Sequence, residues 1–436
     1  HQLKSQEGSF SQSVRLSFEK INPNKIKRAG FKFGIVGAMP EEYRSNLFGS
    51  SGYMAGVTSE GKLFGPGIES KTNLPKSALE DLRLTLKVEH KGNNFDFILE
   101  ASKRSNEDKS SVLLFINKSV RMKKGFLGNL SLFADYAQKN HAPSIPADIK
   151  EFQTDVTFQD WQISGDKVKQ NLNQTFGPIL WTQYTLHRGI MKMTAQIAPM
   201  GKMNKEKVYL ELLKKGKWKK LQSSGIHEYA STAHFRIENW DDKQEIPYRV
   251  VLKNGDSIGE WKGTIRKDPK DKNTIKLAAM SCMKDGAFPN HYLQQNVIAQ
   301  DPDILFFAGD QLYEGNGGYG IVRASKIEDV ARASLNYLPK YWIFGWSFRD
   351  VMKDRPSIVI PDDHDVYHGN IWGLGGGPVP EGGNKGSDGG YAMHPEWVRM
   401  VERTQVSNLP DPYDPTPALQ DIGVYYTDFN YGGISM

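Results

Sequence analysis

The chain has 436 residues, more than one hydrophobic core usually serves, and we therefore expect two or three domains. Its apolar fraction of 38% and charged fraction of 24% are those of a globular protein and argue against disorder and coiled coil. The formal net charge of +6 is mild and does not indicate a nucleic-acid-binding protein. No segment approaches the roughly 20 consecutive apolar residues of a membrane span.

The single cysteine, Cys282, rules out a disulfide within the chain, so its role is that of a core residue, a reactive thiol or a metal ligand. The chain begins at His1 with no leader after it, as in a mature secreted protein or a fragment. We therefore expect a periplasmic or extracellular location. Residues 425–436 are typical of a strand, a turn and the start of another strand, so we expect the fold to continue beyond Met436.

Residues 1–150 have the pattern of an all-β domain. Residues 82–89 alternate between apolar and polar side chains, and the turn at 91–94 leads into a matching segment at 95–101, which predicts a hairpin. Strand follows strand without a helix, which predicts a β-sandwich. The rhythm resembles the concanavalin-like jelly rolls attached to carbohydrate-active enzymes, which makes a polysaccharide a candidate partner. The proline-rich residues 141–148 mark the expected domain boundary.

Residues 151–270 predict a second β-sandwich. Alternating segments at 191–197 and 207–212, followed by a short apolar strand at 247–252, fit an immunoglobulin- or fibronectin-like domain. The basic segment 214–220 lies between two of these strands. A solvated hairpin loop is its simpler interpretation, and a grip on an anionic polymer is the alternative.

Residues 271–436 change to a pattern of alternating strands and helices. We expect strands at 275–282, 302–309 and 356–360, and helices at 291–299 and 326–352. This alternation is typical of an α/β layered domain with parallel strands.

Each expected strand of this last domain is followed by side chains that bind metals. Cys282 follows the first strand, Asp310 follows the second, and the cluster Asp362, Asp363, His364 and Asp365 follows the third. Parallel strands deliver their carboxyl ends to one edge of the sheet, so these residues are expected to meet there. Clustered carboxylates and a thiolate repel one another unless a cation lies between them. Mostly oxygen ligands with one sulfur fit iron, manganese or zinc, with calcium beside it.

Three motifs occur in order along this domain: Ser281-Cys282, then Gly-Asp-Gln-Leu-Tyr-Glu at 309–314, then Pro-Asp-Asp-His-Asp at 361–365. Together they resemble the alkaline phosphatase D (PhoD-like) family of metallophosphoesterases. The resemblance covers only the last third of the chain. It implies hydrolysis of phosphomonoesters or phosphodiesters by a metal-activated hydroxide, with two metal ions, iron and calcium, as cofactors.

The resemblance also implies a role for each matched residue. Cys282, Asp310 and Tyr313 would ligate an iron-like ion, and Asp310 would bridge to a second ion, calcium in this family. Asp363 would bind that second ion, and His364 would face the phosphate. Asp363 and His364 are therefore the expected catalytic residues.

Three further residues are candidates near these. Asp362 and Asp365 would be metal ligands or would orient the ligands, and Asn370 corresponds to a family asparagine that follows the motif. Family members carry additional histidine and aspartate ligands in later segments, and no such motif occurs before Met436. We therefore expect a truncated site that is inactive or weakly active.

The sequence is less consistent with other functions. The glycine-rich residues 373–377 and 382–386 lack the Gly-Lys-Ser/Thr ending of a phosphate-binding loop, and no Gly-x-Ser-x-Gly elbow is present. A carbohydrate-binding or surface protein with a non-functional phosphatase-like domain is the alternative from a different class. A nuclease or a sulfate-ester hydrolase is a weaker one, and the absence of a Cys/Ser-x-Pro-x-Arg motif argues against the usual sulfatases.

Overall fold

The computed structural model describes residues 2–4, 7–21, 26–39, 42–46, 52–103, 111–121, 127–136, 155–171, 174, 177–200, 206–254, 257–368, 375–383 and 388–436. The chain divides into two compact units, His1–Gln174 and Thr175–Met436. The boundary expected at 141–148 and the candidate residue Asn370 lie outside the described residues. Within the described ranges, no helix has both the length and the apolar character needed to cross a membrane.

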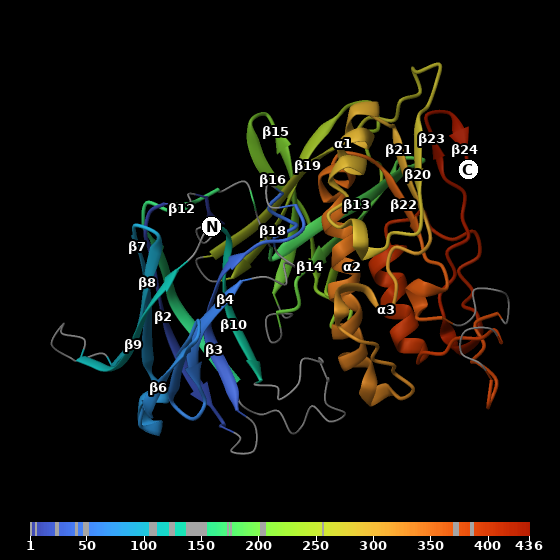
Figure 1. Ribbon diagram of the computed structural model, residues 1–436. Helices are drawn as coiled ribbons and strands as arrows, with labels where there is room; N and C mark the ends of the chain where they lie inside the picture. The colour runs from blue at the N-terminus through green and yellow to red at the C-terminus, as the bar shows by residue number, and fades with distance from the viewer. Residues whose placement is uncertain are drawn as a thin grey trace. The chain divides into compact units, whose positions relative to one another are not determined.

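The first unit contains a sheet of seven strands in the order β12-β1-β10-β3-β4-β5-β6 and a sheet of five in the order β11-β2-β7-β8-β9 (Figure 1). The strand bounds of the first sheet are β1 (Gln2–Leu3), β3 (Lys27–Ile35), β4 (Tyr53–Thr58), β5 (Lys62–Gly65), β6 (Ile68–Asn73), β10 (Gly128–Tyr136) and β12 (Val168–Lys169). Those of the second are β2 (Phe10–Glu19), β7 (Leu82–Lys91), β8 (Asn94–Lys103), β9 (Ser111–Arg121) and β11 (Asp155–Ser164). A short 3-10 helix, η1 (Lys76–Glu80), precedes β7.

One apolar core joins the two sheets of this unit. Leu82, Leu84, Leu86 and Val88 alternate inward along β7 and are fully buried, as the sequence pattern requires of a strand with one face in a core. They belong to the same cluster as inward residues of the other sheet, such as Phe33. β7 and β8 pair antiparallel across the turn at 91–94. The predicted hairpin and the predicted β-sandwich are both confirmed.

The end of this sandwich differs from the predicted boundary at residue 150. β11 pairs with β2, and β12 pairs with β1. Val156 and Phe158 of β11 pack against the first core. Residues 155–169 therefore complete the first sandwich, because their apolar side chains are needed to cover its edge.

The second unit begins with two antiparallel sheets in the orders β13-β14-β17 and β16-β15-β18-β19. Their strands are β13 (Ile179–His187), β14 (Ile190–Ile197), β15 (Lys207–Lys214), β16 (Lys217–Gly225), β17 (Thr232–Ile237), β18 (Ile246–Asn254) and β19 (Ser257–Ile265). The two sheets share one cluster of buried apolar residues, which makes them a second sandwich. Lys214 and Lys217 face each other across the tight turn between β15 and β16. The basic segment is therefore the turn of a hairpin together with the first residues of β16, 217–220, which pair with β15.

A parallel sheet in the order β20-β21-β22 follows in the same unit. Its elements are β20 (Leu277–Met280), α1 (His291–Gln300), β21 (Ile304–Ala308), α2 (Val330–Met352) and β22 (Ser357–Ile360). Helix α3 (Pro395–Gln405) and the hairpin β23 (Asn430–Tyr431) and β24 (Ile434–Ser435) come after it. Short 3-10 helices connect these elements: η4 (Asp285–Ala287), η5 (Asn316–Gly318), η6 (Ile327–Asp329), η7 (His364–Val366) and η8 (Leu419–Asp421). The predicted alternation of strand and helix is observed.

Strand β13 joins the second sandwich to this α/β region. Side chains on both of its faces are buried, because the sandwich core lies on one face and helix α2 on the other (Figure 1). Trp181 of β13 packs edge-on against Tyr341 of α2, with ring centroids 5.4 Å apart. Tyr184 forms a parallel bridge with Pro356, next to β22. The change from the sandwich to the α/β pattern lies between β19 and β20, near the predicted position 270, and both parts belong to one compact unit.

Candidate functional site

The carboxyl ends of the three parallel strands lie at one edge of their sheet. Met280 pairs with Phe307, and Ala308 pairs with Ile360, so the strands end nearly level. Beyond the strands, the Cys282 amide donates to the Gly309 carbonyl at 3.3 Å. The segments that carry Cys282, Asp310 and Asp363 therefore meet at this edge, as expected for a parallel sheet.

The backbone at this edge explains the Gly-Asp pair. Gly309 has φ of +79°, and a Cβ built on it would lie 2.5 Å from the Cβ of Asp362. Only glycine allows the loop after β21 to approach the loop after β22 this closely. Cys282 and Asp310 also have left-handed φ angles of 60° and 53°. Such angles are uncommon in residues with side chains and concentrate at functional sites.

Asp310 lies at the centre of the site and is 8% exposed. Its Oδ1 has no hydrogen-bond partner among the described residues, and its Oδ2 lies 3.7 Å from the Cys282 Sγ. Burial raises the pKa of Asp310, against the opposing effects of the Tyr313 hydroxyl and the His364 charge. A buried carboxylate oxygen without a partner is unfavourable unless a cation or a ligand pairs with it.

Tyr313 lies against the same groups. Burial, followed by interaction of its hydroxyl with Cys282 and Asp310, raises its pKa. Its ring packs against that of His364, with centroids 4.2 Å apart. A role for Tyr313 as a phenolate ligand therefore requires a metal beside it.

Asp310, Asp363 and His364 each place a potential ligand atom within 4.8 Å of the other two. Burial lowers the pKa of His364, but the hydrogen bond and charge of Glu314, with the charges of Asp310 and Asp363, raise it above its ordinary value. The unpartnered Asp310 Oδ1 and this set of oxygen and nitrogen donors fit a divalent or trivalent metal ion. Cys282 adds a sulfur that would suit iron or zinc.

Glu314 and His368 complete a second group that sequence reasoning missed. Ligand atoms of Glu314, His364 and His368 also lie within 4.8 Å of one another. The signal was present in the sequence as two spacings of four residues, from Asp310 to Glu314 and from His364 to His368. Both residues are next to predicted site residues, but the resemblance assigned neither of them a role.

Asp362 and Asp365 stand apart from both groups of ligand atoms. Asp365 is fully buried and accepts hydrogen bonds from the backbone amides of Gln311 and Asp362, at 3.0 Å and 2.8 Å, and from the Gln405 side chain at 2.9 Å. It therefore fastens the loop after β21 to the loop after β22. Burial raises its pKa to about 7 despite these donors. The Asp362 side chain accepts from the Asp363 amide at 2.9 Å.

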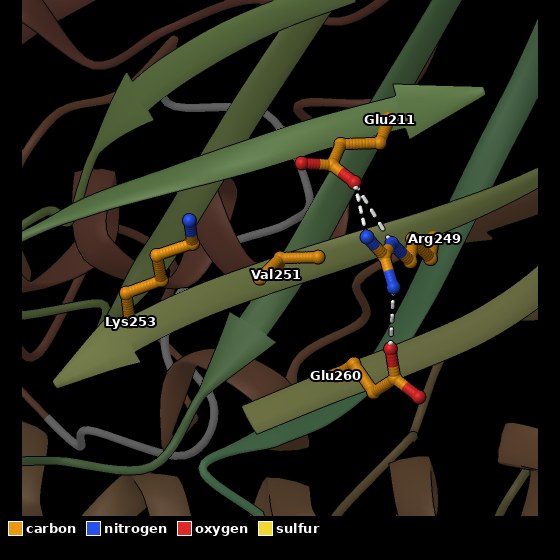
Figure 2. A pocket seen from close by; sticks show the side chains of 5 residues that line it. All are labelled: Glu211, Arg249, Val251, Lys253 and Glu260. Atoms are coloured by element: carbon orange, nitrogen blue, oxygen red, sulfur yellow. Dashed lines mark hydrogen bonds and ion pairs between the residues drawn. The ribbon is translucent and has the colours of Figure 1, made fainter. Parts of the chain in front are cut away.

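A separate cavity of about 400 Å³ lies on the four-stranded sheet of the second sandwich, lined by Glu211, Arg249, Val251, Lys253 and Glu260 (Figure 2). The charge of Arg249, in the middle of this lining, is already paired within the sheet, because its guanidinium contacts Glu211 at 2.7 Å and Glu260 at 3.1 Å. The Arg249 guanidinium also lies over the ring of Trp218 at 4.8 Å. These contacts make the surface a network of ion pairs that holds neighbouring strands together.

Comparison with models of protein families finds no match, and comparison with curated proteins finds no similar chain. Among solved structures, a beta-glycosidase from Bacteroides vulgatus aligns with 11% identity and a TM-score of 0.20, covering 77% of this chain and 49% of that one. This chain thus spans about half the length of that structure. A likeness this weak carries no argument about fold or function.

Proposed function

We propose that the edge of the parallel sheet is a metal centre and that the protein hydrolyses phosphate esters. The observation that supports this most directly is the buried Oδ1 of Asp310, which has no hydrogen-bond partner among the described residues. It lies in a cluster where Asp363 and His364 supply further ligand atoms. Cys282, Asp310, Tyr313 and Asp363 would hold the ions, which we propose to be iron with calcium, with zinc or manganese as the alternatives.

A bound metal pair would supply a nucleophilic hydroxide at neutral pH and neutralise charge on the phosphoryl group. The residues of the chain would provide the geometry around the phosphate. His364, which is partly exposed, would face the phosphoryl oxygens or the leaving group. Asp365 would keep the loops after β21 and β22 at a fixed separation by accepting a hydrogen bond from the Gln311 amide, while Gln405 of α3 holds the same carboxylate in place. We further propose a periplasmic or extracellular location.

The test is metal analysis of the purified protein together with hydrolysis of p-nitrophenyl phosphate and bis-p-nitrophenyl phosphate. We expect bound transition metal near one equivalent, less of it in Cys282→Ser, and loss of both metal and turnover in Asp310→Asn and Asp363→Asn. Asparagine keeps the shape of each side chain but removes the charge that binds a cation. Glu211→Gln, in the cavity of the second sandwich, is the matched control and should keep wild-type values.

Two results would contradict the proposal. One is a wild-type protein that binds no metal after incubation with Fe²⁺, Zn²⁺ or Mn²⁺. The other is full turnover in Asp310→Asn, which would place the reaction elsewhere.

A further inference from the structure

The Glu314 carboxylate lies between two histidines of the site. Glu314 is 6% exposed. Its Oε2 lies 2.9 Å from His364 Nδ1, and its Oε1 lies 2.8 Å from His368 Nε2. The other ring nitrogen of His368, Nδ1, lies 3.4 Å from the Asp363 carboxylate. The four side chains thus form a continuous series that starts and ends at candidate catalytic residues.

These distances distinguish hydrogen bonding from metal binding within the Glu314 group. A tetrahedral zinc ion with bonds near 2.0–2.1 Å would separate neighbouring ligand atoms by about 3.3 Å. The contacts of Glu314 are shorter than that and lie in the range of ordinary hydrogen bonds. The contact with His364 has the geometry of a hydrogen bond. The contact between Glu314 Oε1 and His368 Nε2 is equally short but does not have that geometry. Glu314 is therefore hydrogen-bonded to His364 and only close to His368.

The hydrogen bond determines how His364 presents its ring. A carboxylate can only accept, so His364 donates a proton from Nδ1 to Glu314, and its Nε2 remains as the nitrogen that could bind a metal ion. The neighbouring ring of Tyr313 restricts the tilt of the imidazole. Histidines that bind metals commonly donate their other N–H to a carboxylate, which fixes the tautomer and makes the ring a stronger ligand.

His368 reaches Glu314 through a constrained backbone. Tyr367 and His368 both have left-handed φ angles, 61° and 60°. The His368 amide donates to the Asp363 carbonyl at 2.8 Å, which closes the turn. Two consecutive residues with left-handed backbone angles are energetically unfavourable and persist where the surrounding structure requires them. Here the turn they form places the His368 ring beside Glu314.

The geometry points to Glu314 as a positioning residue that fixes the proton and the orientation of His364, with His368 as its second partner. This inference rests on the proposed metal centre. It assigns a role to two residues outside the predicted ligand set. Glu314 would act through His364 and not as a ligand of the ion.

The experiment compares Glu314→Gln with Glu402→Gln, a partly buried glutamate on α3 that belongs to neither ligand group. Mn²⁺ affinity is measured by calorimetry, and the Nδ1 proton of His364 is observed by NMR of metal-free protein labelled with ¹⁵N-histidine, assigned with His364→Gln. We expect Glu314→Gln to bind Mn²⁺ roughly 10–100-fold more weakly and to leave the Nδ1 proton less protected from exchange, because a neutral amide oxygen is a weaker acceptor than a carboxylate. Glu402→Gln should leave both unchanged.

The two readouts separate this inference from the proposed function. If wild-type protein binds no Mn²⁺, the proposed function fails, while the His364 proton still reports on positioning by Glu314. If Mn²⁺ binds and Glu314→Gln keeps both affinity and the protection of that proton, the inference is overturned. Should Glu314→Gln not fold, the wild-type spectrum decides, because a His364 with no proton on Nδ1 contradicts the assignment.

Discussion

The two units differ in how many charged side chains they bury. In the first unit the buried charges among the described residues are Arg44, which pairs with Glu42 at 2.9 Å, and Lys167. The second unit buries many more charged residues: Asp268, Asp303, Asp310, Glu314, Lys340, Arg349, Arg355 and Asp365. Burying charge is unfavourable without partners, so its concentration in one unit indicates where the chain uses it.

Comparison within the second unit separates structural charges from candidate functional ones. Lys340 is fully buried and donates to the Gly320 carbonyl, the Asn336 side chain and the Tyr367 hydroxyl at 2.7–2.8 Å. Burial lowers its pKa to about 7. These three acceptors give Lys340 a structural role. Asp310, in contrast, keeps an oxygen without a partner in the described part of the chain, which is why the metal centre is proposed there.

The largest expected effect comes from removing metal. Dialysis against a strong chelator should abolish phosphate-ester hydrolysis and lower the unfolding temperature of the second unit only. Ligands that bind the folded state stabilise it by about 2.7 kcal/mol at one hundred times their dissociation constant. Differential scanning calorimetry with and without metal measures the unfolding temperatures. Unchanged unfolding temperatures together with retained hydrolysis would contradict the proposal that the second unit holds a metal centre.

Phe33→Ala should destabilise the first unit by about 3–5 kcal/mol, because it leaves a cavity in an apolar core. Phe33 is fully buried, with its ring centroid 5.8 Å from that of Phe10 and 5.9 Å from that of Tyr53. Urea denaturation followed by fluorescence measures the loss. Mn²⁺ affinity should stay at the wild-type value, and a parallel loss of affinity would show that the units do not function separately.

His234 makes the stability of the second unit depend on pH. Burial, followed by the charges of Arg403, His227 and Lys192, lowers its pKa to about 3. The ring is therefore neutral in the folded state, while the unfolded chain takes up a proton below about pH 6.5. Its contribution to stability is complete above that pH and is lost as the pH falls toward 3.

At pH 5 this loss is about 2 kcal/mol. In His234→Gln the free energy of unfolding should therefore fall less between pH 7.5 and pH 5 than in the wild type. The amide can retain hydrogen bonds to Thr194 and Thr232, which contact the imidazole at 3.3 Å and 2.9 Å. Denaturation curves at both pH values measure this free energy. The same change with pH in the wild type and in His234→Gln would contradict the role assigned to His234.

The smallest expected effect tests the packing of α2 on β13. A Cβ added at Gly345 would lie 2.4 Å from the ring of Trp181, which is 1% exposed and has no room to move. Overpacking costs about 1–3 kcal/mol, and alanine returns up to about 1 kcal/mol as the better helix former. We expect Gly345→Ala to destabilise the second unit by about 1–2 kcal/mol.

Gly225→Ala is the control for this substitution, since a Cβ there meets nothing within 4 Å. Thermal unfolding of both variants measures the difference. A Gly345→Ala protein as stable as the control would show that the sandwich and the α/β region are less tightly joined than their shared strand indicates.

Local pattern was sufficient for much of the fold. The alternation at 82–89 predicted β7, and the turn at 91–94 predicted its pairing with β8, because both depend on neighbouring residues only. The assignment of 155–169 to the first sandwich was not predictable in this way. β11 and β2 pair across more than a hundred residues, and no local signal records which distant edge a strand will cover.

The candidate site divides along the same line. The pattern of residues was enough to predict that Cys282, Asp310 and Asp363 follow parallel strands, whose ends lie at one edge of a sheet. It did not predict that Asp365 turns inward to join two loops, or that Glu314 and His368 turn toward His364, because these directions depend on how the whole unit packs. Side-chain direction in irregular loops depends on backbone angles such as those of Tyr367 and His368, which the packing of the whole unit sets.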